Sequence, residues 1–266
     1  FADAAEIHAL ARVLRRHGAA YSTHMRDEGD HVFEAVREAI AVAEATGVHV
    51  QIAHLKLSGV DNWGGAARLL AEIEAARGRG LPIDCDAYPY DTATNPLRNL
   101  LPRWVMEGGI PAMLERLRVR DVRTRIRDEI ERNGLTNFGR IASWDAVRVA
   151  ISPHLPENAG RTLGDIARSR GVTPIDAVAD YVVADRGETR ILVTSMTEAD
   201  VREITGAPWV TVGSDGNALA VTGVTSQGKP HPRYYGTHAY VLGPCVRDLR
   251  LLTLEAAVAK MTGGAA

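Results

Sequence analysis

The chain has 266 residues, of which 45% are hydrophobic and 24% are charged. This length allows a full core, in one α/β domain or two smaller ones. The formal net charge of −2 gives no global basic field, which argues against nucleic acid or an anionic membrane as a partner. No apolar run approaches the ~20 residues that span a bilayer, and no signal-peptide pattern opens the chain, so we expect a cytoplasmic protein.

The first 90 residues alternate expected helices with expected strands. Helical spacing of apolar residues predicts helices over 3–17, 31–46 and 63–77, and short β-prone runs predict strands over 20–24, 50–54 and 81–88. Strands that alternate with helices at about 30-residue intervals favour a parallel sheet with right-handed crossovers. This part of the chain is therefore expected to form βα units of one sheet.

The regular alternation stops over residues 91–190. We expect helices near 109–132 and 162–184 and a short strand at 139–143, and we interpret the segment as a helical insertion across a barrel mouth. The arginine-dense stretch within the first of these helices also carries acidic residues and an apolar stripe. It therefore predicts an amphipathic helix with a solvated face rather than a nucleic-acid surface.

The alternation resumes near residue 190. A strand over 190–194, a helix over 197–205 and a strand over 209–213 are expected, and the last of these leads into Asp215. The loop over 216–236 is rich in glycine, proline and polar residues, and its length suggests a function. A terminal helix is expected to begin near Thr253, with Glu255 in its first turn.

Three of the expected strands end in residues with catalytic potential. His24 and His54 stand at two strand ends one βα unit apart, and Asp215 follows a third strand. In an α/β barrel the carboxyl ends of the strands meet at one mouth. Two neutral imidazoles supply half of a four-coordinate zinc shell. Asp215 by itself suits a helix cap or a turn, but beside the histidines it is a candidate proton carrier for a metal-assisted hydrolase.

Five motifs together extend this interpretation. They are Thr-His-Met-Arg-Asp-Glu at 23–28, Ala-His-Leu-Lys at 53–56, Tyr-Pro-Tyr at 88–90, Gly-Ser-Asp-Gly at 213–216, and His-Pro-Arg at 231–233 with Tyr-Gly-Thr at 235–237. In this order they resemble the N-acyl-D-amino-acid deacylases, or D-aminoacylases, which belong to the amidohydrolase superfamily of metal-dependent TIM-barrel hydrolases. The resemblance extends over nearly the whole chain.

The resemblance implies a role for each matching residue. It makes His24 and His54 zinc ligands and Asp215 the catalytic acid/base. It also assigns three further residues to the free carboxylate of the substrate, namely Lys56, Tyr88 and Arg233. Arginine suits this task because its planar fork binds a carboxylate through two parallel hydrogen bonds, to which lysine adds a point charge.

The residues taken singly leave other interpretations open. Lys56 could be a solvated loop lysine, Tyr88 a packed strand aromatic, and Arg233 the partner of a nearby carboxylate. Tyr90 is as good a choice of register as Tyr88. Two further histidines, His231 and His238, flank Arg233 and are expected to line the pocket.

The sequence also departs from the family pattern. It contains no His-x-His motif, and Cys85 stands too late to be the metal-binding cysteine of the family, so we interpret it as a buried apolar residue. The other cysteine is Cys245, and the pair predicts no disulfide framework. The chain begins at Phe1 rather than methionine, and we expect both ends to be cut from a longer protein.

These observations predict an α/β fold that is part of a TIM (β/α)8 barrel of the metal-dependent hydrolase type. Residues 1–90 would supply βα units of the barrel, 91–190 the insertion, and 191–266 the last barrel strands and the terminal helix, with the N-terminal part of the barrel missing. The expected reaction is zinc-dependent hydrolysis of small N-acyl-D-amino acids to a D-amino acid and a carboxylate. The alternatives are a dipeptidase or cyclic-amide hydrolase, and a non-catalytic fragment that lacks the first metal ligands.

Overall fold

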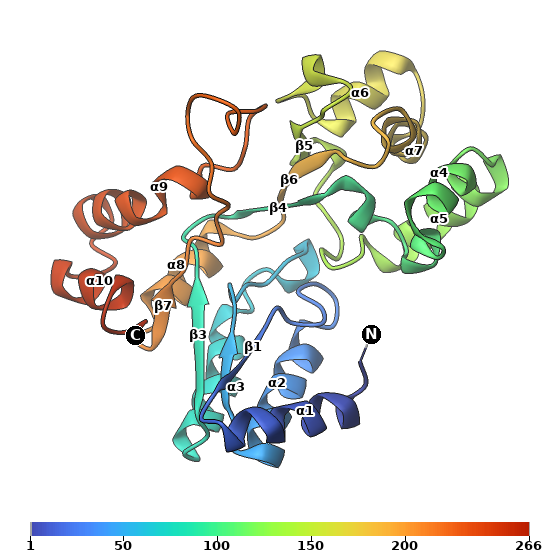
Figure 1. Cartoon of the computed structure of the whole chain (residues 1–266). Coiled ribbons are helices and arrows are strands. Elements are labelled where there is room, and N and C mark those ends of the chain that lie inside the picture. Colours follow the sequence, from blue (N-terminus) through green and yellow to red (C-terminus); the bar gives the residue numbers. More distant parts are fainter. Residues whose placement is uncertain (1, 266) are drawn as a thin grey trace.

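Four parallel strands form one sheet of the structure (Figure 1). The predicted histidines and aspartate follow the carboxyl ends of three of these strands. The structure, a computed structural model, describes residues 2–265. The sheet has the order β1-β2-β3-β7. Its strands are β1 (Ala20–Thr23), β2 (His49–Ile52), β3 (Ile83–Ala87) and β7 (Val210–Val212). The predicted parallel sheet is thereby confirmed, and it brings the residues that follow each strand to one edge.

Five helices pack beside this sheet and bury its apolar residues. They are α1 (Ala4–Arg16), α2 (Val32–Thr46), α3 (Ala66–Gly78), α8 (Glu198–Gly206) and α10 (Leu254–Met261). In α2 the apolar stripe predicted by helical spacing is buried, and the helix ends at Gly47 in a left-handed conformation. Cys85 of β3 is fully buried in the same core, as predicted, and burial raises the pKa of its thiol.

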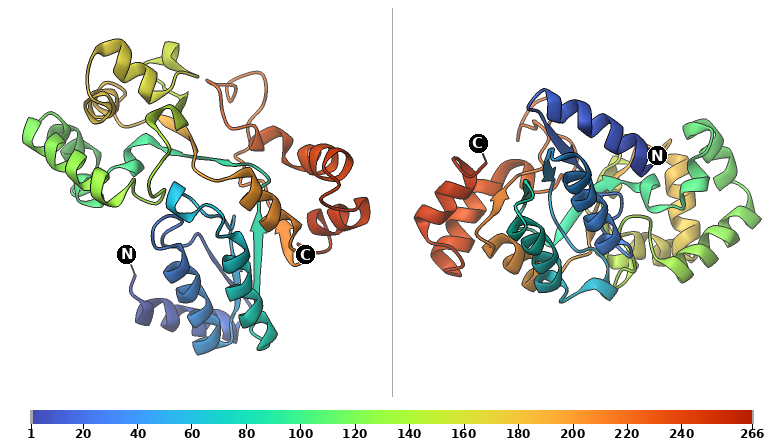
Figure 2. Two further views of the ribbon diagram at one scale, coloured as in Figure 1. Left: turned by 180° about the vertical axis from the view of Figure 1, so that it is seen from behind. Right: turned by 90° about the horizontal axis from the view of Figure 1, so that it is seen from below.

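A second unit stands over the carboxyl edge of the parallel sheet, and the left view of Figure 2 shows it apart from α1 to α3. Its antiparallel sheet has the order β4-β6-β5, formed by β4 (Thr92–Pro96), β5 (Val147–Ile151) and β6 (Arg190–Thr194). Four helices belong to the same unit: α4 (Gly109–Leu117), α5 (Arg120–Asn133), α6 (Leu163–Arg170) and α7 (Pro174–Ala184). The insertion therefore contains its own sheet and its own hydrophobic core.

The strand predicted at 190–194 is present as β6, but it pairs with β4 and β5 rather than with the barrel strands. An alternating apolar run indicates a strand, yet it carries no information about which distant strand becomes its partner. The strands β4 and β5 were not predicted. The insertion is accordingly an α/β unit, not a purely helical one.

Three further predictions in the insertion are corrected. The strand at 139–143 is wrong, because Gly139 adopts a left-handed conformation in a turn closed by hydrogen bonds to Leu135. The helix expected over 109–132 is interrupted at Val119, whose backbone is extended. The helix expected over 162–184 is divided by Gly171 and by Thr173, whose side chain caps α7.

The C-terminal part follows the prediction more closely. The loop after β7 ends where α9 (Arg233–Tyr240) begins, so the last residues of the predicted loop over 216–236 are helical. A π-helical segment, Val241–Asp248, follows, and Thr253 caps α10 with Glu255 in the first turn, as predicted. Within residues 2–265 no helix combines the length and apolar character that crossing a membrane requires.

A buried lysine near β7 gives the fold a testable dependence on pH. Lys260 of α10 donates hydrogen bonds to the carbonyl oxygens of Ala207 and Val210, and burial lowers its pKa from 10.5 to about 8. Below pH 8 the lysine is charged in both the folded and the unfolded state. Between about pH 8 and 10.5 only the unfolded state keeps the proton, so stability rises with pH across this window.

We therefore expect the free energy of unfolding to rise from pH 8 to pH 10 by on the order of 2 kcal/mol more than in Lys260→Met. Urea unfolding at both pH values measures this difference. Lys229→Met removes an exposed lysine and is the matched control. Its free energy of unfolding should rise between pH 8 and pH 10 as much as that of the unsubstituted protein. Identical pH dependence in Lys260→Met and the unsubstituted protein would show that Lys260 does not cause the rise in stability.

Candidate active site

A cavity of about 780 Å³ lies where the parallel sheet meets the insertion. From the sheet side it is lined by residues that follow the strands β1, β2, β3 and β7, which are His24, His54, Tyr88 and Asp215. From the insertion side it is lined by polar residues that include Asn95, Asn99, Asn137 and Arg190. The site is thus built from two units that are far apart in the sequence.

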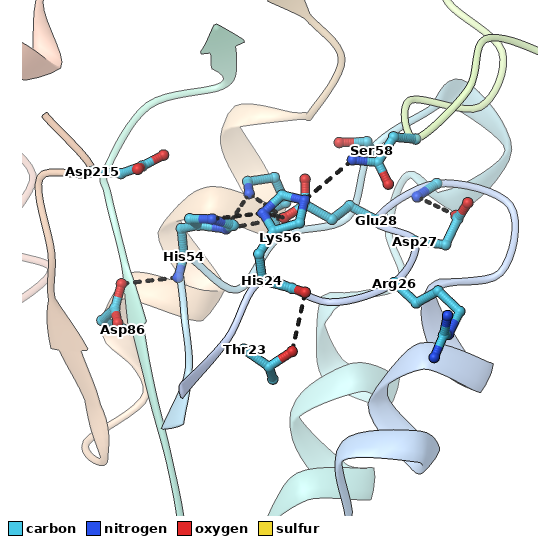
Figure 3. Close-up of polar contacts among 12 residues, drawn as sticks. Thr23, His24, Arg26, Asp27, Glu28, His54, Lys56, Ser58, Asp86 and Asp215 are labelled. Carbon is cyan, nitrogen blue, oxygen red and sulfur yellow. Dashed lines mark hydrogen bonds and ion pairs between the residues drawn. The ribbon is translucent and has the colours of Figure 1, made fainter. Parts of the chain in front are cut away.

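The two predicted metal ligands are in contact at the floor of this cavity (Figure 3). Nδ1 of His24 and Nε2 of His54 are 2.9 Å apart, and the ring centroids are 4.6 Å apart. Partial burial lowers the pKa of His24, which favours the neutral imidazole that ligates metals. The side chain of His24 is half exposed, whereas His54 is buried.

A buried ion pair lies directly behind the histidines. Nζ of Lys56 is 2.5 Å from Oε1 of Glu28 and 2.6 Å from Nδ1 of His54, and Oε1 of Glu28 is 3.0 Å from the same Nδ1. Burial by itself would raise the pKa of Glu28, but Lys56 and His54 reverse the shift and lower it to about 2. Burial alone would likewise lower the pKa of Lys56, and the Glu28 carboxylate raises it instead.

The backbone at His54 is held in an uncommon conformation. Its φ is 41°, in the left-handed region, and its backbone N–H donates to Oδ1 of Asp86 at 2.9 Å. The other oxygen of Asp86 accepts from Gln51 at 2.8 Å, and a Cβ at Gly213 would come within 2.6 Å of the carboxylate. Residues with positive φ gather at functional sites, because the surrounding structure must compensate their strain.

Asp215, Arg233 and Tyr88 form a second cluster in the wall of the same cavity. Oδ2 of Asp215 is 2.7 Å from Nη2 of Arg233, and the guanidinium lies 4.6 Å from the centre of the Tyr88 ring. Asp215 also has a positive φ of 45° and is partly exposed to the cavity. The Tyr88 hydroxyl and Nε of Arg233 are buried without any hydrogen-bond partner among the described residues. Such unpaired polar groups are rare, and a ligand can satisfy them.

The residues present fit a zinc ion. Within residues 2–265, one group of three potential ligands has its donor atoms within 4.8 Å of one another, and it consists of His24, Glu28 and His54. When Nδ1 of His54 carries the proton toward Glu28, its Nε2 presents a lone pair toward Nδ1 of His24, so both rings direct nitrogen to one point. Two imidazoles and a carboxylate are the donor types that zinc prefers. Asp215 lies outside this group (Figure 3).

The structure brings all six predicted site residues to one cavity. Their chemical roles stay predictions. Lys56 is not a solvated loop lysine, because it is only 4% exposed and is paired with Glu28. Neither His231 nor His238 lines the cavity, contrary to expectation. Tyr88 lines the cavity and Tyr90 does not.

Sequence reasoning missed Glu28 as a site residue. It stands in the Thr-His-Met-Arg-Asp-Glu motif, four residues after His24, but no helix connects the two positions. The acidic end of that motif was the available signal. In the folded structure, the turn over residues 26–31 brings the Glu28 carboxylate back beneath the histidines, and the sequence alone does not reveal this.

Comparisons with known proteins agree on one group of relatives. The chain is 33% identical to an N-acyl-D-glutamate deacylase of Alcaligenes xylosoxydans xylosoxydans over 98% of its own length and 43% of the relative. It is also 33% identical to a D-aminoacylase of the same organism over 97% of its length and 43% of the relative. The chain thus spans less than half of the relatives it matches. A scan of family models gives no match.

Solved structures give the same result. The N-acyl-D-glutamate deacylase of Bordetella bronchiseptica, complexed with zinc and a phosphonate that mimics the tetrahedral intermediate, superposes with a TM-score of 0.74 at 30% identity, over 99% of this chain and 45% of that one. A D-aminoacylase described as defining a novel subset of amidohydrolases superposes with a TM-score of 0.71 at 31% identity, over 98% of this chain and 44% of that one. These matches confirm the predicted fold class, an α/β partial barrel.

Proposed function

We infer that this chain is part of an N-acyl-D-amino-acid deacylase, an amidohydrolase, and that it supplies two zinc-ligating histidines, the proton-carrying aspartate and the substrate-carboxylate pocket. The chain matches relatives with this activity over nearly its whole length. The complete protein would hydrolyse the amide of a small N-acyl-D-amino acid in the cytoplasm. Zinc, when bound, would polarise the scissile carbonyl and lower the pKa of a bound water.

The observation that carries this proposal is a pair of unpaired donors in two side chains that line the cavity. The Tyr88 hydroxyl and Nε of Arg233 are buried, lack partners among the described residues, and belong to side chains that line the cavity with Asp215. A substrate carboxylate has the acceptor oxygens that these donors lack, and an arginine fork binds it with directional specificity. A neutral cyclic amide would offer these donors no carboxylate.

The chain's own residues divide the chemistry within this one cavity. His24 and His54 would hold the metal, and Glu28, itself held by Lys56, would accept the Nδ1 proton of His54 and fix its ring. Asp215 would accept a proton from the attacking water at a carboxylate oxygen and return it to the leaving amine. Arg233 would hold the substrate carboxylate and orient Asp215 through their ion pair.

The decisive experiment assays the full-length protein that contains this chain. N-acetyl-D-amino acids, their L-enantiomers, a dipeptide and a dihydropyrimidine are offered in parallel, and amine release is measured. We expect hydrolysis of the D-compounds only. Turnover of the dipeptide or the cyclic amide instead would replace the proposal with the sibling amidohydrolase activity, and absence of both turnover and bound zinc would favour a non-catalytic scaffold.

Substitution of Arg233 tests the carboxylate pocket. We expect Arg233→Lys to lower kcat/KM for an N-acetyl-D-amino acid by about 10- to 100-fold, mainly through KM, because a point charge replaces a bidentate fork. Steady-state kinetics measure the effect. Arg247→Lys changes an exposed arginine outside the cavity and serves as the matched control. An unchanged KM in Arg233→Lys would remove Arg233 from substrate binding.

A further inference from the structure

His231 forms a buried bridge between the insertion and the helix that carries Arg233. Its side chain is 1% exposed. Nε2 lies 2.8 Å from the carbonyl oxygen of Thr92, the first residue of β4 in the insertion. Nδ1 lies 2.9 Å from the backbone nitrogen of Arg233, the first residue of α9. One ring therefore joins two units that the sequence separates by 139 residues.

These two contacts determine which nitrogen carries the proton. A carbonyl oxygen accepts only, so Nε2 must donate to Thr92, and a backbone N–H donates only, so Nδ1 must accept from Arg233. The ring is thus a neutral Nε2–H tautomer. Burial lowers the pKa of His231 to about 4, which agrees with a ring that stays neutral. Tyr90 packs edge-on against it, with centroids 5.2 Å apart and an interplanar angle of 85°.

Nδ1 of His231 accepts a hydrogen bond from the backbone N–H of Arg233 at the start of α9. The first N–H groups of a helix have no partner inside the helix. The N–H of Arg233 is such a group, and the imidazole of His231 satisfies it, while the next N–H groups bond to the carbonyls of His231 and Pro232. The start of α9 is thereby fixed relative to β4. The guanidinium of Arg233 extends from this fixed point to Asp215 and across the Tyr88 ring.

We propose that His231 is a positioning residue for substrate binding: its ring ties the backbone of Arg233 to strand β4 of the insertion, so that the insertion sets where the carboxylate-binding guanidinium lies. This inference rests on the proposed function of Arg233. The ring does not itself line the cavity. It contacts the backbone of Arg233 directly, and it also lies beside the rings of Tyr88 and Tyr234, which do line the cavity. The insertion would then help to position a substrate-binding residue, in addition to lining the cavity.

Three substitutions in the full-length protein separate the two hydrogen bonds. His231→Asn can keep an acceptor for the Arg233 N–H, His231→Gln can keep a donor for Thr92, and His231→Phe keeps neither while filling the space. We expect His231→Phe and His231→Gln to raise KM for an N-acetyl-D-amino acid by about 10-fold with little change in kcat, because binding rather than chemistry is disturbed. His231→Asn should raise KM to a similar extent, because it loses the hydrogen bond to Thr92 and with it the link to β4.

A double-mutant cycle measures the coupling between positions 231 and 233, which a purely structural role of His231 would not produce. In an Arg233→Lys background, His231→Phe should raise KM by less than about 2-fold, because residues that act through one contact are not additive. Equal losses in both backgrounds, or a His231→Asn or His231→Gln variant with an unchanged KM, would overturn the inference. If His231→Phe does not fold, as judged by thermal unfolding, the His231→Asn and His231→Gln variants decide in both backgrounds.

The same assay distinguishes failure of this inference from failure of the proposed function. An unsubstituted protein that does not hydrolyse any N-acetyl-D-amino acid would overturn the proposed function and this inference with it. If the unsubstituted protein is active but the effects of the substitutions at 231 and 233 on KM are additive, only the role of His231 is overturned.

Discussion

Replacement of Asp215 by asparagine in the full-length protein is expected to lower kcat for N-acetyl-D-amino acids by about 10³-fold, within the range of 10² to 10⁴ typical of a lost general acid/base. Asparagine keeps the size of the side chain and can still accept a hydrogen bond from Arg233, but it cannot take up a proton at the reacting water. Zinc bound to the full-length protein should remain, because the proposal assigns His24 and His54 to the metal and Asp215 lies outside the group of possible ligands.

The measurement combines steady-state kinetics with metal analysis of the same preparations. Asp84→Asn is the matched control, because Asp84 pairs with Arg77 and His49 and does not line the cavity. It should retain turnover within about 2-fold, as surface substitutions usually have small effects. Full activity in Asp215→Asn would remove Asp215 from the proton-transfer role, and loss of zinc would indicate that it binds the metal instead.

The second large effect concerns stability. Lys56→Met is expected to lower the free energy of unfolding by about 3 to 5 kcal/mol, the usual cost of leaving one member of a buried ion pair without its partner. Lys56 and Glu28 are each 4% exposed at the side chain, so solvent does not compensate the orphaned carboxylate. Adding Glu28→Gln to Lys56→Met should restore part of the loss, because the uncompensated charge is then removed as well.

Urea unfolding of the zinc-free protein measures these differences. Arg79→Met removes one member of the exposed ion pair with Glu44 and should cost less than about 1 kcal/mol. Because the pKa of Glu28 falls from 4.5 to about 2 on folding, its stabilising contribution is complete above about pH 4.5 and declines as the pH falls toward 2. A Lys56→Met variant as stable as Arg79→Met would refute a buried, charged pair.

The site residues that could be predicted from the sequence are those marked by the residues next to them in the chain. His24, His54 and Asp215 each follow a short β-prone run, and parallel strands bring their carboxyl ends together whatever the loops between them do. The buried Cys85 followed from strand alternation in the same way. Lys56 shows the limit of this reasoning, since neither its burial nor its partner can be deduced from the residues beside it.

Hydrophobic periodicity and strand-end chemistry, which lie within short stretches of sequence, were enough to predict the parallel sheet, its helices and the three residues at its mouth. Tertiary structure alone decided that β6 joins β4 and β5, that Glu28 lies beneath the histidines, and that His231 connects the insertion to Arg233. The physical reason is that strand pairing and side-chain contacts between distant segments depend on the whole arrangement of the chain, whereas periodicity and turn chemistry act over a few residues.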